Sequence, residues 1–154
     1  MNVAQFAVAR DAGTLATLGL GSCIALMLYD ERARVGAMAH ILLPHESMSR
    51  ERGHPAKFAS TAVPLLVREL RLAGALGTPI AKLAGGASMF GALLATGGVN
   101  MGERNIVATR RALAEAHIPL AAEDVGGDYG RSVYFDVATG AVRVASIRHG
   151  TRHV

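Results

Sequence analysis

The first third of the chain places its apolar residues in short runs of the length typical of β-strands. Residues 2–9 alternate apolar and polar positions well enough for one strand, and residues 15–20 form a second short candidate. Two continuous apolar runs of strand length follow, at residues 24–29 and 35–43. A polar turn at residues 30–34 separates them, so we expect the two runs to pair as an antiparallel hairpin.

The middle of the chain changes to the spacing of an amphipathic helix, which buries one face. The apolar positions with this spacing are Phe58, Ala62, Leu65, Leu66, Leu70 and Ala73. Pro64 conflicts with a regular helix interior, because proline lacks an N–H group and clashes with the preceding turn. We therefore expect Pro64 either to kink this helix or to mark its first turn.

Helix and strand signals continue towards the end of the chain. Residues 80–83 form a short strand candidate. Asn100 is followed three residues later by Glu103, which resembles a capping box and predicts a helix to about His117. Residues 132–146 alternate on both sides of a central turn, which is typical of a hairpin.

The order of strands, then helices, then strands again favours an α+β fold over a doubly wound α/β fold. Consecutive strands without a helix between them pair antiparallel, so the strands should be mainly antiparallel. We expect one domain over residues 1–154, because no repeat, low-complexity tract or linker divides the chain. Two segments should be mobile: a polar surface loop at residues 45–55 and a tail at about residues 149–154.

Composition and charge narrow the classes of function. The formal charge is +4, but the basic residues are scattered and aromatic residues make up only 5% of the chain, so nothing indicates nucleic-acid binding. No apolar run approaches the roughly 20 residues that span a bilayer. The single cysteine, Cys23, cannot form an internal disulfide and would be an oxidation liability after export. We therefore expect a cytoplasmic protein without membrane insertion.

This lone cysteine stands in a context suited to nucleophilic chemistry. Cys23 follows Gly19-Leu20-Gly21-Ser22, and His40 is the nearest histidine along the chain. A hairpin turning at residues 30–34 brings Cys23 and His40 to the same end, because a similar number of residues separates each from the turn. Thiol and imidazole then form a candidate Cys–His acyl-transfer site. In the alternative interpretation, Cys23 is a small buried hydrophobic residue and His40 an ordinary core residue.

The glycine turn before the thiol could also supply an oxyanion site. Backbone N–H groups at Gly21, Ser22 and Cys23 are candidates, because a turn can aim consecutive amides at one point. The glycines around Ser22 do not have the spacing of a nucleophile elbow, so Ser22 is not the expected nucleophile. The glycines match neither a dinucleotide fingerprint nor a phosphate loop, and the histidines have no clustered carboxylates nearby. We therefore expect no cofactor and no metal.

Five blocks of sequence carry a resemblance to known proteins. They are residues 17–30 (TLGLGSCIALMLYD), 36–44 (GAMAHILLP), 81–90 (AKLAGGASMF), 102–105 (GERN) and 124–140 (DVGGDYGRSVYFDVATG). Together they resemble the CheD family of bacterial chemoreceptor glutamine deamidases. The blocks keep the order of the family and have similar spacing, so the resemblance extends over nearly the whole chain.

The resemblance implies a layered α/β/β sandwich with protein-glutamine deamidase activity on the helical cytoplasmic parts of chemotaxis receptors. It implies that Cys23 is the nucleophile, that His40 is the base and then the acid, and that Thr17 orients His40. An imidazolium at His40 would lower the pKa of Cys23 and give more thiolate. A CheC-type phosphatase is a second partner implied by the family.

Two other functions stay open at this stage. One is a non-catalytic binding module that regulates a CheC-type phosphatase or a chemoreceptor and retains an idle Cys–His pair. The other is a Cys–His protease or transamidase of different specificity. The presence of Thr17, Cys23 and His40 together favours catalysis over pure binding, and a chain of this length leaves no room for a separate specificity subdomain of a protease.

Overall fold

The computed structural model describes residues 1–51, 53–89 and 98–154. Phe90, the last residue of the third sequence block, lies outside the described residues. The described strands are β1 (Phe6–Arg10), β2 (Thr14–Leu20), β3 (Ile24–Asp30), β4 (Val35–Ile41), β5 (Ile80–Gly85), β6 (Leu120–Val125), β7 (Arg131–Asp136), β8 (Val142–Ser146) and β9 (Gly150–His153). The described helices are α1 (Ala59–Leu72) and α3 (Met101–Glu115), with short 3-10 turns η1 (Glu46–Met48) and η2 (Pro55–Lys57).

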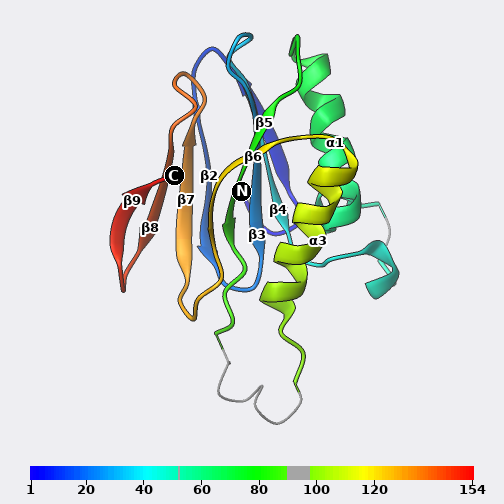
Figure 1. The fold of residues 1–154 in the computed structure, drawn as a ribbon, viewed down its shortest axis with the longest axis vertical. Helices are drawn as coiled ribbons and strands as arrows, with labels where there is room; N and C mark the ends of the chain where they lie inside the picture. The colour runs from blue at the N-terminus through cyan, green and yellow to red at the C-terminus, as the bar shows by residue number, and fades with distance from the viewer. Residues whose placement is uncertain (52, 90–97) are drawn as a thin grey trace.

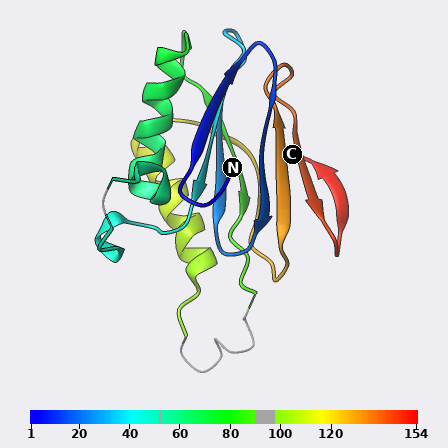
Figure 2. The same cartoon turned by 180° about the vertical axis from the view of Figure 1, so that it is seen from behind.

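The elements form three layers (Figures 1 and 2). One sheet has the strand order β1-β4-β3-β5-β6, and the other has the order β2-β7-β8-β9. Both helices cover one face of the first sheet, and the second sheet packs on its other face. Neighbouring strands are antiparallel except β5 and β6, which are parallel. The expected α+β sandwich with mainly antiparallel strands is confirmed.

Strands β3 and β4 occupy the middle of the molecule, where every one of their residues is buried. Successive side chains of a strand point to opposite faces, so Leu26 packs towards the helices and Met27 packs towards the second sheet. Burial on both faces explains why the two strands read as continuous apolar runs rather than as alternation. In β4, His40 lies two residues after Met38 and therefore shares its face, towards the second sheet.

The two predicted hairpins are confirmed. β3 and β4 pair antiparallel, with Ile24 opposite Ile41 at one end and Asp30 opposite Val35 at the other. β7 and β8 form the hairpin expected at residues 132–146. Helix α3 begins after Asn100, whose side chain accepts a hydrogen bond from the Glu103 backbone at 3.0 Å. The predicted cap is therefore present, although the helix ends at Glu115 rather than near His117.

Helix α1 buries the predicted apolar face against the first sheet. Pro64 lies inside α1, so the expectation that it marks the first turn is wrong. Its ring is exposed on the solvent side of the helix, away from the buried residues Ala62 and Leu66 that pack in the core. The hydrogen bond that proline cannot donate is thus lost on the side that does not pack.

Two segments differ from the sequence-based expectations. β6 was not predicted; it follows α3 and pairs with β5 in parallel, as a strand–helix–strand crossover does. We expected a flexible tail at about residues 149–154, but Gly150–His153 forms β9 and pairs with β8. Every residue of β9 is exposed, so no apolar pattern revealed this edge strand. The polar segment 45–55 contains the turn η1 and the start of η2.

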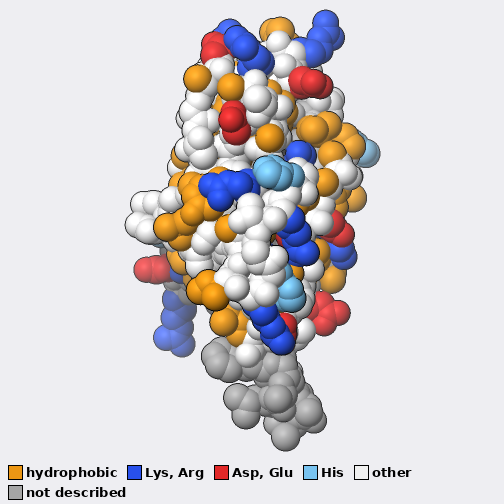
Figure 3. Space-filling model, turned by 90° about the vertical axis from the view of Figure 1, so that its left-hand side faces the viewer, with side chains coloured by type: hydrophobic (Ala, Val, Ile, Leu, Met, Phe, Trp, Pro, Cys, Tyr) orange, Lys and Arg blue, Asp and Glu red, His pale blue; other side chains and the backbone are white. Residues whose placement is uncertain are grey.

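The outer face of the second sheet carries mixed surface chemistry. Basic, acidic and hydrophobic side chains are intermingled there, with no single-sign stripe (Figure 3). Such a surface lacks the footprint of a nucleic-acid-binding face. Among the described residues, neither helix has the length and apolar character needed to cross a lipid bilayer.

Candidate active site

The candidate nucleophile lies where the chain crosses from one sheet to the other. Residues 21–23 connect β2 of the second sheet to β3 of the first. Cys23 is half-buried and packs against the cluster of side chains between the two sheets. Just before the crossing, the end of β2 is irregular: Gly19 has φ +68°, and the pairing of β2 with β7 shifts its register between Thr17 and Leu20.

The hairpin register brings His40 to the same end of the first sheet as Cys23. His40 is buried and stands opposite Ala25, two residues after Cys23, so the thiol and the imidazole are diagonal neighbours on one face. Diagonal neighbours of this kind are about 7–8 Å apart at their Cα atoms, which long side chains can span. The prediction that a hairpin brings these residues to the same end is thus confirmed.

Thr17 reaches the imidazole from the opposite sheet. The Thr17 Oγ1 atom lies 2.8 Å from His40 Nδ1 and 3.0 Å from the carbonyl oxygen of Met1. The carbonyl can only accept, so the single hydroxyl proton of Thr17 goes to Met1, and Oγ1 accepts from Nδ1–H. This arrangement fixes the tautomer of His40 and leaves its Nε2 atom as the unprotonated nitrogen.

The Nε2 atom of His40 is buried and has no hydrogen-bond partner among the described residues. A buried acceptor without a partner is uncommon and often marks a functional group. An unprotonated Nε2 on the same face as a thiol is what a general base requires. In this resting structure Nε2 does not hydrogen-bond Cys23, as is common for catalytic groups before substrate binds.

The electrostatics favour a neutral pair at rest. Burial raises the pKa of the Cys23 thiol above its ordinary value. Burial, and after it the positive charge of the Met1 amino group, lowers the pKa of His40. The thiol therefore stays protonated and the imidazole unprotonated near neutral pH, in contrast to the thiolate–imidazolium pair expected from the sequence.

The carbonyl groups of three consecutive residues before β3 are all held by other parts of the chain. Gly21 O accepts from Ala87 N at 2.8 Å, and Cys23 O accepts from Gly86 N at 2.8 Å. Ser22 O accepts from Asn105 Nδ2 at 2.9 Å. These bonds orient the peptide units of the crossing, whereas the N–H groups of Ser22 and Cys23 have no partner within the described residues.

A cavity of about 410 Å³ opens beside the thiol. Its walls come from residues 21–23, 87–89 and 99–102. The segment at 87–89 follows the double glycine Gly85-Gly86, where the backbone passes so close to Cys23 that a side chain at Gly85 would collide with the Cys23 carbonyl. The predicted site residues Gly21, Ser22 and Cys23 thus line one cavity, while Thr17 and His40 lie behind it, between the sheets.

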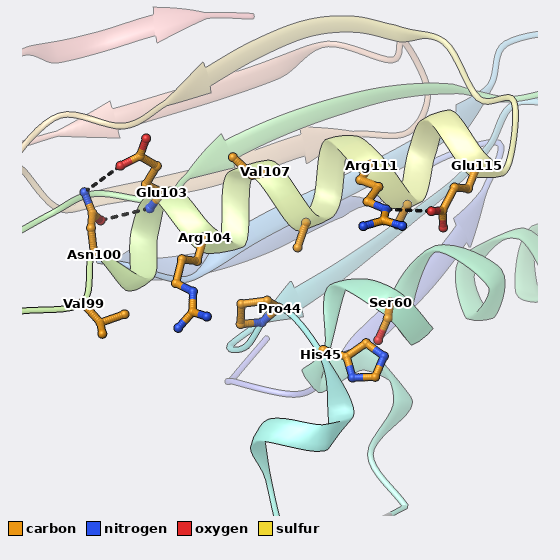
Figure 4. A pocket seen from close by; sticks show the side chains of 12 residues that line it. Pro44, His45, Ser60, Val99, Asn100, Glu103, Arg104, Val107, Arg111 and Glu115 are labelled. Atoms are coloured by element: carbon orange, nitrogen blue, oxygen red, sulfur yellow. Dashed lines mark hydrogen bonds and ion pairs between the residues drawn. The ribbon is translucent and has the colours of Figure 1, made fainter.

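A second, larger groove of about 980 Å³ adjoins this cavity, since Val99 and Asn100 line both. The groove runs along α3, with Pro44, His45 and Ser60 on the opposite wall (Figure 4). Its exposed side chains combine apolar Val107 with the charged groups of α3, namely Glu103, Arg104, Arg111 and Glu115. A protein segment could therefore lie along α3 and reach Cys23 at one end.

Sequence reasoning gave no role to Asn105, although it belongs to the GERN block. Asn105 is fully buried and bridges two carbonyl oxygens, those of Ser22 and Leu42. The available signal was the position of Asn105 in the helix, next to Ile106 and with Thr109 one turn further on, on the face that α3 buries. A polar side chain on a buried face usually has a hydrogen-bond partner. No group of three or more His, Cys, Asp or Glu side chains in the described ranges is placed to hold a metal.

The fold is an α+β sandwich of two sheets with helices on one face. It holds a thiol where the chain crosses between the sheets, and an oriented imidazole lies behind that thiol. These features are typical of a cysteine hydrolase, which is the candidate class for this site. Comparison with known proteins then identifies the family. Residues 42–146 match the family described as CheD chemotactic sensory transduction, and the chain belongs to this CheD family.

Relatives of nearly equal length support the assignment. The chain is 45% identical over 152 residues to a "Probable chemoreceptor glutamine deamidase CheD 2" of Geobacter metallireducens, covering 96% of this chain and 93% of that protein. It is 42% identical over 151 residues to the "Chemoreceptor glutamine deamidase CheD" of Thermotoga maritima, covering 97% and 92%. It is 39% identical over 157 residues to a "Probable chemoreceptor glutamine deamidase CheD" of Caldanaerobacter subterraneus, covering 100% and 96%.

Proposed function

We propose that the chain is a chemoreceptor glutamine deamidase in which Cys23 is the nucleophile, His40 the base and then the acid, and Thr17 the residue that orients His40. The observation that carries the proposal is the hydrogen-bond chain from Met1 O through Thr17 Oγ1 to His40 Nδ1, which leaves Nε2 unprotonated on the face shared with Cys23. The relatives bear the name chemoreceptor glutamine deamidase, which gives the substrate class.

In the first half-reaction, His40 Nε2 takes the thiol proton as Cys23 Sγ attacks the amide carbonyl carbon of a glutamine side chain, and the C=O electron pair moves to oxygen to give a tetrahedral oxyanion. The C–N bond then breaks while the imidazolium returns that proton to nitrogen, so ammonia leaves and a thioester remains. In the second half, His40 takes a proton from water, and the resulting hydroxide attacks the thioester. Collapse of that intermediate breaks the C–S bond, the thiol recovers its proton, and glutamate is released.

The N–H groups of Ser22 and Cys23 are the proposed donors to the tetrahedral oxyanion. Both belong to peptide units whose carbonyls are fixed, and both lack partners among the described residues. An oriented donor needs no reorganisation when charge develops, and one such donor contributes about 100- to 1000-fold in kcat. Gly21 also lines the cavity, and a Cβ there would lie 3.0 Å from the sulfur of the Met89 side chain.

The glutamine side chain enters the cavity at Cys23, and the receptor segment that carries it lies in the adjoining groove along α3. Val99 and Asn100 form the shared rim, so a segment in the groove can place one side chain against the thiol. We place the reaction in the cytoplasm, where the receptor parts implied by the family resemblance lie and where a lone cysteine stays reduced. A CheC-type phosphatase is the second partner we propose, on the family resemblance alone.

The test is deamidation of a chemoreceptor cytoplasmic fragment. The reaction is measured by the ammonia released and by the mass increase of about one dalton per modified glutamine. The Cys23→Ala variant serves as the matched control, because it removes only the sulfur. Activity in the wild type and none in the folded variant is the expected result. Equal activity in both would overturn Cys23 as nucleophile, and receptor binding without any activity would favour a regulatory binding module.

A further inference from the structure

Asn105 joins the two segments that carry the proposed nucleophile and base. Its Nδ2 group donates to Ser22 O at 2.9 Å and to Leu42 O at 3.0 Å. Ser22 is the residue before Cys23, and Leu42 is two residues after His40. Because both neighbours are carbonyl acceptors, only the nitrogen of the amide can face them, which fixes the orientation of the side chain.

The same contact determines where the N–H of Cys23 points. In a trans peptide the C=O and the N–H of one unit point in opposite directions, and the chain has no cis peptide bond among its described residues. Asn105 holds the carbonyl of the Ser22–Cys23 peptide towards its own amide group, so the Cys23 N–H points away from the Asn105 side chain. That N–H has no partner in the described ranges, and Cys23 lines the cavity.

Of the three fixed carbonyls in the crossing, the other two are held by backbone N–H groups of Gly86 and Ala87. In the described structure, Asn105 is the one side chain that hydrogen-bonds a carbonyl of residues 21–23. It is therefore the one anchor of these carbonyls that a change of side chain can remove. Its Oδ1 atom is buried and has no described partner, so the side chain is placed by its two donor bonds.

We propose that Asn105 is a positioning residue for deamidation, which holds the Ser22–Cys23 peptide so that the Cys23 N–H serves as oxyanion donor. The proposal rests on the function proposed above. Asn105 touches neither substrate nor the reacting atoms; it acts through the peptide unit. Without its two donor bonds the Ser22 carbonyl loses its bridge to Leu42, and the donor at Cys23 loses its fixed direction, while the pairing of Ile24 with Ile41 still holds β3 against β4.

The test separates oxyanion stabilisation from thiol reactivity. Alkylation of Cys23 by iodoacetamide forms no tetrahedral oxyanion, whereas deamidation does. Asn105→Leu keeps a similar volume and removes both donor bonds. We expect kcat on a chemoreceptor fragment to fall about 100-fold, the loss typical of misplaced catalytic groups, with little change in KM. The rate of Cys23 alkylation should stay within about threefold of wild type, as the thiol and His40 keep their places.

Thr109→Val is the matched control. Thr109 lies one turn further along α3, is equally buried, and donates only to the Asn105 carbonyl within the helix, at 2.7 Å. It should retain wild-type kcat. Asn105→Ser, which keeps one hydroxyl donor, provides a second variant if Asn105→Leu does not fold, and its kcat should also fall while alkylation persists.

Unchanged kcat in a folded Asn105 variant would overturn the proposal. A parallel fall of kcat and alkylation would also overturn it, because Asn105 would then place the thiol rather than the oxyanion donor. The Cys23→Ala control distinguishes a failure of the proposed function from a failure of the role proposed for Asn105. If Cys23→Ala is as active as wild type, the proposed nucleophile is wrong; if it is inactive while Asn105→Leu is normal, only the role of Asn105 is wrong.

Discussion

Replacing Thr17 by valine tests whether the hydroxyl orients the base. Valine keeps the shape of threonine but cannot accept from His40 Nδ1, which now lies 2.8 Å from Oγ1. A buried donor left without a partner costs about 1–3 kcal/mol. If the same free energy is lost from the transition state, kcat falls about 5- to 150-fold, since each 1.36 kcal/mol is a factor of ten.

The expected order of activities follows from the chemistry of the three side chains. Cys23→Ala and His40→Ala remove the proposed nucleophile and the proposed base, so the activity of both variants should fall to background. Thr17→Val retains both groups and loses only the control of the imidazole tautomer, so measurable activity should remain. Thr17→Ser keeps the oxygen that bonds Met1 and His40, and it should stay within a few-fold of wild type.

The assay is ammonia release from a chemoreceptor fragment at saturating substrate, with circular dichroism to establish that each variant folds. Two results would refute the reasoning. Wild-type kcat in Thr17→Val would show that the hydroxyl does not control the tautomer. A loss in Thr17→Val as complete as in Cys23→Ala would show that Thr17 does more than orient His40.

Three further predictions concern packing, titration and substrate contact. Alanine usually stabilises a helix relative to glycine by about 1 kcal/mol, but a Cβ at Gly102 would lie 2.5 Å from Ala87 O and closer still to Gly86 O. Gly102→Ala should therefore lower the free energy of unfolding in urea by about 1–3 kcal/mol, and a gain would contradict the close approach. Because the folded-state pKa of His40 is lowered, the unfolded state binds the proton first as pH falls below the ordinary value of 6.5. The free energy of unfolding of the wild type should therefore fall more steeply below this pH than that of His40→Gln. Parallel pH profiles of the unfolding free energy in urea would contradict this. Arg104→Glu and Val107→Asp in the groove should raise KM for a receptor fragment and leave kcat unchanged. Leu76 is 81% exposed and lies outside both the groove and the cavity, so the control Leu76→Asp should change neither constant. Equal KM in all three variants would argue against the groove as the binding site.

Much of the fold was predictable because its signals are local. The apolar runs around a polar turn predicted the β3–β4 hairpin, and its register follows from the turn between them. Asn100 and Glu103 predicted the start of α3 from two residues alone. Such features depend on nearby residues, so a single sequence reveals them.

The remainder depends on exposed pairing and on packing that the local apolar pattern does not show. β9 is an exposed edge strand that gains its place only by pairing with β8. The resting protonation of Cys23 and His40 could not be predicted, because burial between two sheets and the amino group of Met1 determine it. The hydrogen bonds of Asn105 to Ser22 and Leu42 could not be predicted either, because they form only where α3 packs beside the crossing and they join residues more than sixty positions apart.

In the proposed mechanism, a triad without a carboxylate changes where the charge is balanced during the reaction. Thr17 accepts from the imidazole but carries no negative charge, so it cannot offset the imidazolium that forms when His40 takes the thiol proton. The compensating charge is the oxyanion of the tetrahedral intermediate, which forms in the same step. Both charges arise from a neutral resting pair in a half-buried site, where unpartnered charge is costly. Backbone donors that stabilise the oxyanion therefore stabilise the whole ion pair, which gives the anchoring of the Ser22–Cys23 peptide by Asn105 its importance for the rate.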